Sequence, residues 1–189
     1  MGIFACPVCG GSLLRGEKAC RCSAGHSYDI AREGYVYLLP PNKRHSVDPG
    51  DDRAMIAARR RFLEAGHYEL FSDCLNRLVR EGVGTPSPVV LDAGCGEGYY
   101  TGRLLDSLVK SGGTPEISGF DISKSAVRAA AKQYRRISFA VASMFGIPVL
   151  PGSADCVTDV FAPIVPGQLN RVLRPGGLLV LAVPSERHL

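Results

Sequence analysis

The stretch from 90 to 101 decides the fold, and it reads Val90-Leu-Asp92-Ala-Gly94-Cys-Gly96-Glu-Gly98-Tyr-Tyr-Thr101. An apolar run ends in a carboxylate, three glycines alternate with other residues, and a helical pattern follows. Glycines let the backbone turn tightly and approach a ligand at the carboxyl edge of a parallel sheet. The next expected strand ends in Asp121, 29 residues after Asp92. A carboxylate there can hold two ribose hydroxyls, so the stretch predicts a nucleotide-type site.

The glycine spacing distinguishes between cofactors. A dinucleotide fingerprint, G-x-G-x-x-G, would need glycine where Tyr99 stands, and the third glycine is instead Gly98. No Lys-Ser or Lys-Thr pair follows the glycines, which excludes a phosphate-binding P-loop. The pattern D-x-G-x-G-x-G resembles motif I of class I S-adenosylmethionine (SAM) methyltransferases. The predicted contacts to SAM from this part of the chain are Asp92, Gly94, Gly96, Glu97, Gly98 and Asp121.

Strand and helix patterns alternate outward from this stretch. Such a rhythm predicts a parallel sheet with helices on both faces, here in the strand order 3-2-1-4-5. The expected strands are Val89–Asp92, Glu116–Asp121, Ile137–Val141, Asp155–Phe161 and Leu178–Val183, with helices at 99–110, 123–134 and 166–173. The fold class is α/β: a Rossmann-like class I methyltransferase sheet with a small N-terminal zinc-binding module. Strands 6 and 7 of the class I sheet are expected to be missing, which would leave the substrate grip weak.

The predicted domains are a zinc-binding module at 1–36, a helical connector at 37–86 and a methyltransferase domain at 87–189. Asp51 and Asp52 are expected to cap a helix at 53–65, and a second helix is expected at 68–80 with Phe71, Cys74, Leu75 and Leu78 at helical spacing. The strand Leu178–Val183 is expected to form an exposed edge, which favours aggregation or self-association as a homodimer.

A metal site is predicted near the N-terminus. Cys6-Pro-Val-Cys9 is followed after twelve residues by Cys22 and after three more by His26. The pattern C-x2-C-x12-C-x3-H supplies four ligands for tetrahedral Zn2+ and leaves no open position, so the zinc is expected to be structural. The alternatives are reduced structural thiols or a redox C-x-x-C pair. Cys20 is the rival third thiolate, and we favour Cys22 on the expectation that the two side chains point to opposite sides of the chain.

Composition narrows the class of protein. The chain has 189 residues, 46% of them hydrophobic and 21% charged, which is typical of a globular protein. The longest apolar run has six residues and no signal peptide is recognisable, so no membrane association is expected. Seven unevenly placed cysteines favour a reducing cytoplasm over a disulfide framework. The net charge of +4 is compatible with a nucleic-acid partner without proving one.

Three further features carry weaker hypotheses. Asp159 lies toward the end of the fourth expected strand and either accepts a proton from a substrate nitrogen or is a solvated strand-end carboxylate. The run Arg59-Arg60-Arg61 is more typical of a solvated helix face than of a phosphate contact. Tyr99 and Tyr100 open an expected helix, and the two hypotheses for them are stacking on a base and packing into the core.

The order of zinc module, connector and methyltransferase resembles the bacterial 23S rRNA guanine-N1 methyltransferases, some of which confer resistance to macrolides such as tylosin. The resemblance covers essentially the whole chain. It is carried by Cys6/Cys9/Cys22/His26, Ala31-Arg-Glu-Gly-Tyr-Val36, Leu38-Leu39-Pro40, Asp48-Pro-Gly50, Ala65-Gly-His-Tyr68, Leu91–Thr101, Asp121-Ile-Ser-Lys124, Phe161-Ala-Pro163, Leu173-Arg-Pro-Gly-Gly177 and Arg187-His-Leu189.

This resemblance implies methyl transfer from SAM to N1 of a guanine at position 745 or 748, in a stem-loop of large-subunit rRNA. It also implies that Tyr68, Gly96, Glu97 and His188 contact SAM. The alternatives are a methyltransferase acting on another substrate, or a zinc-dependent RNA-binding protein whose methyltransferase domain is vestigial.

Overall fold

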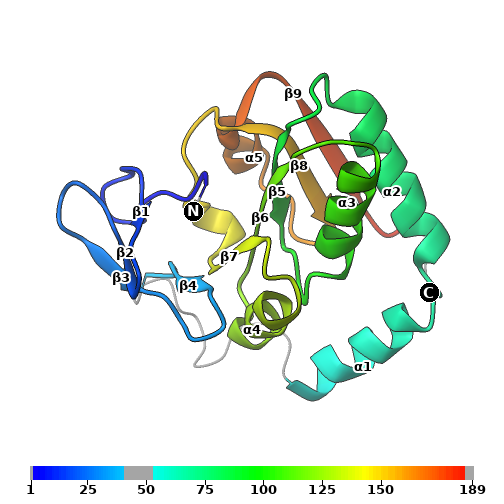
Figure 1. The fold of residues 1–189 in the computed structure, drawn as a ribbon, viewed down its shortest axis with the longest axis horizontal. Coiled ribbons are helices and arrows are strands. Elements are labelled where there is room, and N and C mark those ends of the chain that lie inside the picture. The colour runs from blue at the N-terminus through cyan, green and yellow to red at the C-terminus, as the bar shows by residue number, and fades with distance from the viewer. Residues whose placement is uncertain (1, 41–52, 186–189) are drawn as a thin grey trace.

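The structure, a computed structural model, describes residues 2–40 and 53–185. Two parts of the chain pack against each other: a small N-terminal ribbon and a larger α/β domain (Figure 1). The segment Asp48-Pro-Gly50, the expected cap residues Asp51 and Asp52, and the predicted SAM contact His188 lie outside the described residues.

A six-stranded parallel sheet forms the centre of the α/β domain. Its order is β4-β7-β6-β5-β8-β9. The strands are β4 (Val36–Tyr37), β5 (Val89–Ala93), β6 (Glu116–Asp121), β7 (Ser138–Val141), β8 (Ala154–Val160) and β9 (Leu173–Ala182). The predicted fold class and the order of the last five strands are confirmed. Strand β4 was not expected, because two residues give too short a pattern to recognise; it begins at the last residue of the module predicted to end at 36.

Helices cover both faces of this sheet. α2 (Glu69–Gly82), α3 (Tyr99–Lys110) and α4 (Lys124–Gln133) pack on one face. α5 (Pro166–Val172), the short 3-10 helix η2 (Met144–Gly146) and the ribbon pack on the other. The period-two alternation of strands explains the division: Val90 enters the first core and Leu91 the second. None of the helices in 53–185 is both long and apolar enough to cross a membrane.

Two elements differ from the sequence prediction. β9 begins at Leu173 rather than Leu178, since Leu173 pairs with Ala154 before an irregularity in the register. The Asp155 carboxylate fixes that early part of the strand by an ion pair with Arg174 at 2.5 Å. On α2, the buried face is formed by Ser72, Leu75, Asn76 and Val79, whereas Cys74 and Leu78, expected on that face, are exposed.

The N-terminal ribbon is built into the larger domain. Its antiparallel strands are β1 (Leu14–Arg15), β2 (Ala19–Arg21) and β3 (Ser27–Asp29). Phe4 forms an isolated bridge with Val149 in the loop after η2, and the Ala5 N–H donates to the Pro148 carbonyl at 2.8 Å. Phe4 is fully buried in the same core as Leu91 of β5. The ribbon therefore shares its core with the sheet instead of forming a separate module.

Candidate functional site

The four predicted zinc ligands converge at one point of the ribbon. Their ligand atoms, the three Sγ and a ring nitrogen of His26, all lie within 4.8 Å of one another. Cys9 Sγ is 3.6 Å from Cys22 Sγ, and His26 Nδ1 lies 3.3 Å from Cys22 Sγ and 3.5 Å from Cys6 Sγ. Zn–S bonds of about 2.3 Å in a tetrahedron place two sulfurs roughly 3.8 Å apart. The donor set and its spacing therefore fit a closed, structural zinc site.

The geometry brings Cys22, not Cys20, to this cluster. Within one strand the two side chains would share a face, so the expectation of opposite faces had the wrong reason. β2 ends at Arg21 and the chain then turns, with the Gly25 N–H donating to the Cys22 carbonyl at 3.0 Å. Cys20 stays on the strand and is fully buried in the core that the ribbon shares with the sheet.

Hydrogen bonds favour the ionised form of the Cys6 thiol, which is the form that binds a metal. Burial opposes ionisation of this thiol, but hydrogen bonds from the Tyr28 hydroxyl and from the backbone N–H groups of Val8 and Cys9 outweigh it. The pKa of Cys6 falls to about 6. The Tyr28 hydroxyl lies 3.0 Å from Cys6 Sγ. Because metal ligation needs the thiolate, this environment favours zinc binding at neutral pH.

The glycine-rich loop between β5 and α3 needs glycine for two separate reasons. Gly94 has a φ of 77°, and a Cβ there would lie 2.4 Å from the Cβ of Ala162, so it permits close approach of the loop after β8. Gly96 has a φ of 53° and faces open space. Residues that carry a side chain rarely adopt this backbone conformation. Glycine at position 96 permits it and leaves the backbone accessible to a ligand.

Asp121 lies beside this loop at the carboxyl end of β6. Its Oδ2 accepts the Gly96 N–H at 2.9 Å and its Oδ1 accepts the Ser123 N–H at 2.8 Å. Asp121 therefore orders the loop, and it also lines the cavity described below, where a ribose contact is expected of it.

Asp92 is buried below the loop and holds it from inside. Its carboxylate accepts hydrogen bonds from the hydroxyl of Thr101, on α3, and from that of Thr158, on β8, the latter at 2.9 Å. Burial raises the pKa of Asp92 to about 6, against the effect of the two hydrogen bonds, and the charge of Asp121 adds to the rise. Asp92 does not line the cavity described next. Its hydrogen bonds instead tie the glycine loop to α3 and β8.

A cavity of about 520 Å3 opens at this edge of the sheet. That size lies within the range of small-molecule sites. The lining comes from α1 (Arg53–Glu64), the residue before α2, the glycine loop, the start of α3, the ends of β6 and β8, the loop after β8 and the segment after β9. The lining residues are Arg59, Phe62, Leu63, Tyr68, Gly94, Cys95, Gly96, Glu97, Tyr99, Tyr100, Asp121, Val160, Phe161, Ala162, Pro163 and Pro184. Five of the eight predicted SAM contacts are thus brought together. Asp92 and Gly98 are not in this lining.

Aromatic rings form one wall of the cavity. Tyr68 lies edge-on to Phe71 and Phe161 at centroid distances of 5.9 and 6.3 Å. Phe161 stacks on Phe71 at 5.7 Å, with 20° between the planes. Phe161 also has a φ of 60°, a conformation that costs energy for a side chain of this size. Its N–H donates to the Ala182 carbonyl at 2.9 Å, which helps to hold the strained residue at the cavity rim.

The three consecutive arginines of α1 have three different environments. Arg60 points to the glycine loop, where its Nε and Nη2 each lie 2.8 Å from Glu97 Oε2. The Glu97 side chain is only 5% exposed, so this pair neutralises a carboxylate that would otherwise be buried alone. Arg59 borders the cavity and is exposed, and Arg61 is exposed outside it. A solvated helix face, the favoured interpretation of the sequence, therefore fits Arg59 and Arg61 and does not fit Arg60.

Asp159 lies just beneath the cavity rim. Its side chain is 1% exposed, and its Oδ1 accepts the Ala162 N–H at 3.1 Å. Oδ2 is buried and has no hydrogen-bond partner within the described part of the chain. Burial raises the pKa of this carboxyl to about 6. Asp159 is therefore not the solvated carboxylate considered from the sequence, and it does not line the cavity; its catalytic role stays a prediction.

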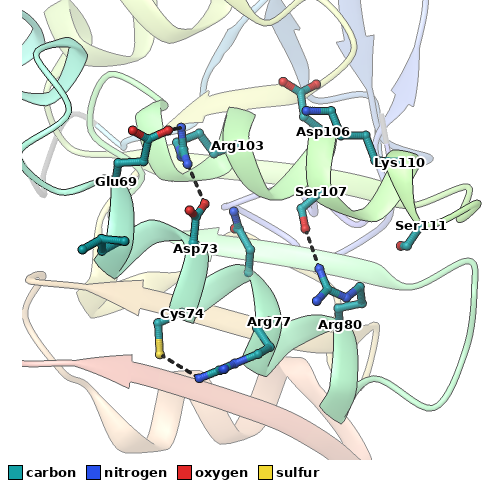
Figure 2. Close-up of a pocket in the computed structure, with 12 residues that line it drawn as sticks. Glu69, Asp73, Cys74, Arg77, Arg80, Arg103, Asp106, Ser107, Lys110 and Ser111 are labelled. Atoms are coloured by element: carbon teal, nitrogen blue, oxygen red, sulfur yellow. Dashed lines mark hydrogen bonds and ion pairs between the residues drawn. The ribbon is translucent and has the colours of Figure 1, made fainter.

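A second hollow of about 820 Å3 lies between α2 and α3 (Figure 2). Figure 2 shows Arg103 reaching toward Glu69 and Asp73, with an Arg103 Nη2 to Asp73 Oδ1 distance of 2.6 Å. Arg80 donates to the Ser107 hydroxyl at 3.1 Å. This groove contains no strand end and no residue of the glycine loop. We place the cofactor in the smaller cavity for that reason.

Two family models match the chain. A zinc-ribbon family described as "RlmA, N-terminal" matches residues 4–47, and a methyltransferase-domain family matches residues 90–177. A Micromonospora griseorubida protein, provisionally named as a 23S rRNA (guanine-N(1)-)-methyltransferase, is 40% identical over 97% of this chain and 66% of its own length. The 23S rRNA (guanine(748)-N(1))-methyltransferase of Streptomyces fradiae is 37% identical over 97% of this chain and 64% of its own.

The resemblance to the 23S rRNA guanine-N1 methyltransferase family is confirmed. The chain spans slightly less than two thirds of the length of these two relatives. Among solved structures, a provisionally assigned SAM-dependent methyltransferase of Methanococcus maripaludis superposes with a TM-score of 0.59 at 18% identity, covering 73% of this chain and 67% of the other. This likeness supports the methyltransferase fold alone.

Sequence reasoning missed several residues of the cavity. Phe62 and Leu63 of α1 and Pro184 after β9 come from segments far from the glycine loop in sequence. The arginine run on α1 was the one available signal for Arg59, and its orientation depends on how α1 packs. No periodicity could have supplied that information.

Proposed function

We propose that this chain transfers a methyl group from SAM to N1 of a guanine in a stem-loop of large-subunit rRNA. The observation that carries the proposal is the match to two rRNA guanine-N1 methyltransferases over 97% of the chain, ribbon and methyltransferase domain together. The cavity that joins the glycine loop, Asp121 and Tyr68 supports it, because these are the residues expected to contact SAM.

Different residues of the chain would bind SAM and position the guanine. SAM, when bound, supplies an activated methyl group on a sulfonium. Asp121 and Gly96 would hold the nucleoside part, and the partly buried Arg60–Glu97 pair fixes the glycine loop. The aromatic wall of Tyr68 and Phe161 offers ring faces on which an unstacked guanine can rest. Catalysis is then mainly a matter of positioning the two reactants within the cavity.

Guanine N1 must lose its proton as the new N–C bond forms. Asp159 is the predicted acceptor, with water as the alternative. The unpartnered Oδ2 and the pKa of about 6 suit a carboxylate that takes up a proton at neutral pH. For Oδ2 to reach a substrate, the loop of Phe161 and Ala162 has to move, because this loop lies between Asp159 and the cavity.

A radiolabel transfer assay tests the proposed function. The chain is incubated with methyl-tritiated SAM and an rRNA stem-loop, and a matched stem-loop carries adenine at the target position. We expect tritium in the first RNA, recovered as N1-methylguanosine after digestion, and none in the second. Equal labelling of both, or label in protein or small molecules alone, would contradict the proposal.

Two further aspects stay proposals. A cytoplasmic location is supported by seven cysteines that form no disulfide in the structure. Self-association as a homodimer is supported by β9, the outermost described strand, on which Leu179 and Leu181 are 38% and 41% exposed. Light scattering of the purified chain tests the second aspect, and a monodisperse monomer would contradict it.

A further inference from the structure

Two stacked rings stand at the mouth of the cavity and face solvent. The Phe62 ring of α1 and the His67 imidazole lie with their centroids 4.6 Å apart and with 24° between their planes. Phe62 lines the cavity and is 48% exposed, whereas His67 is exposed outside the lining. Neither ring is among the predicted SAM contacts, and neither has a part in the reaction proposed above.

The turn between α1 and α2 holds His67 against Phe62. Gly66 has a φ of 85°, the left-handed conformation in which a chain commonly leaves a helix and changes direction. The Gly66 N–H donates to the Leu63 carbonyl at 3.0 Å, and the Gly66 carbonyl accepts the Glu69 N–H at 3.0 Å as α2 begins. These backbone hydrogen bonds fix the turn from both sides, so the ring stack is formed before any ligand binds.

The stack continues into the cavity as a chain of rings. Phe62 lies 5.8 Å from Tyr68 between centroids, with 58° between the planes. Tyr68 in turn lies edge-on to Phe161 at 6.3 Å, and these two rings form the wall proposed above to receive the guanine. His67 is therefore the outer end of a row of rings whose inner end is the place expected for the target base.

We propose that the Phe62–His67 stack is a platform for a second unpaired base of the RNA, the one next to the target guanine. The inference rests on the proposed function and deepens it. A target base has to leave its stack to react, and its neighbour then loses a stacking partner as well. Proteins that recognise unpaired RNA replace such stacking with aromatic and histidine rings. Every base has a π-face, so the platform accepts any base and recognises only that it is unpaired.

Two other partners compete with an RNA base for these rings, namely the adenine of SAM and a second copy of the chain. Adenine would be enclosed by the cavity, whereas His67 lies outside the cavity lining. A second copy would need an apolar surface around the rings, because the core of a protein interface is depleted of charged residues. Arg61 and Glu64, on the same last turn of α1, are charged and exposed. The RNA base is therefore the partner that this surface fits.

Binding of two rRNA stem-loops tests the platform, each carrying fluorescent 2-aminopurine on one side of the target guanine. The proteins are the wild-type chain, His67→Ala, His67→Tyr and the matched control Leu70→Ala, whose side chain is 86% exposed near the same turn. We expect His67→Ala to weaken stem-loop binding by roughly 5- to 100-fold, the range for losing one base stack. One of the two bound probes should also become brighter, because stacking quenches 2-aminopurine. His67→Tyr keeps a ring and should restore both readouts, and Leu70→Ala should match the wild type.

The possible failures are distinguishable. If the wild type neither binds nor methylates the stem-loop, the proposed function itself fails, and the platform fails with it. If the wild type methylates the stem-loop and His67→Ala changes neither its affinity nor either probe, the platform is overturned while the proposed function stands. Weaker SAM binding by His67→Ala in calorimetry would assign the rings to the cofactor, and a changed oligomeric state in light scattering would assign them to a second copy; either result overturns the platform. Matching urea unfolding midpoints for the four proteins exclude a folding defect.

Discussion

Replacing Phe4 with alanine should destabilise the methyltransferase domain, although Phe4 belongs to the zinc ribbon. Phe4 is fully buried, bridges to Val149 and packs in the core that also holds Leu91 and Phe120. Deleting its ring would open a cavity between the ribbon and the sheet. An independently folded ribbon would confine that damage to itself, whereas a shared core transmits it to β5 and β6.

The expected cost follows from the size of the deleted ring. Buried Phe→Ala substitutions destabilise proteins by about 3–5 kcal/mol. With a urea dependence of about 2–3 kcal/mol per molar, the unfolding midpoint should fall by about 1–2.5 M. Val8→Ala is the matched control, because Val8 lies in the same ribbon and is 66% exposed; its midpoint should stay within about 0.2 M of the wild type.

Far-ultraviolet circular dichroism at 222 nm reports unfolding of the methyltransferase domain and not of the ribbon. The described α-helices, α1 to α5, all lie between Arg53 and Val172, and the described part of the ribbon has none. The helical signal therefore follows the methyltransferase domain during urea unfolding. A lowered midpoint for Phe4→Ala supports the shared core. An unchanged helical transition, together with early release of zinc to a colorimetric chelator, would show that the ribbon unfolds alone and refute the reasoning.

Three further predictions concern the zinc and cofactor sites. Cys22→Ser should lose the one zinc expected per chain and lower the helical unfolding midpoint, whereas Cys20→Ser should keep the metal; zinc retention by Cys22→Ser in mass spectrometry would reject the ligand assignment. Asp121→Asn should weaken SAM binding by about 1.5–3 kcal/mol in calorimetry, and an unchanged affinity would rule out the ribose contact. Asp159→Asn removes a carboxyl whose native pKa of about 6 exceeds the ordinary 3.8. The folded wild type binds this proton more tightly than the unfolded chain, so its stability falls as pH rises from about 4 to 6. The stability of Asp159→Asn relative to the wild type should therefore be about 2 kcal/mol higher at pH 7.5 than at pH 4.5 in urea titrations, and a pH-independent difference would contradict the buried-carboxyl assignment.

Local pattern was enough to predict the order of the sheet and the meeting of the zinc ligands. The strand that ends in Asp92, the glycine loop and the strand that ends in Asp121 form a continuous βαβ unit, in which short-range rules act. Ser123 caps α4 as expected, and its hydroxyl accepts the Ala126 N–H at 3.2 Å. These features depend on neighbours in sequence, so the sequence displays them.

Features that depend on tertiary packing could not be predicted. Arg60 contacts Glu97 across 37 residues of sequence, and Phe4 contacts Val149 across 145. Asp159 is buried near the end of β8, two residues before Phe161, whose positive φ the sequence does not predict. Each of these contacts joins segments whose relative positions are set only when the ribbon, α1 and the sheet pack together.

Primer extension on large-subunit rRNA tests the central claim most directly. Ribosomal RNA that lacks N1-methylguanine in the target stem-loop is incubated with SAM and the chain, and reverse transcriptase then reads through the region. N1-methylguanine blocks base pairing, so the account predicts a new SAM-dependent stop one nucleotide before guanine 745 or 748. Read-through identical to that of the sample without SAM, under conditions where calorimetry shows SAM bound, would contradict it.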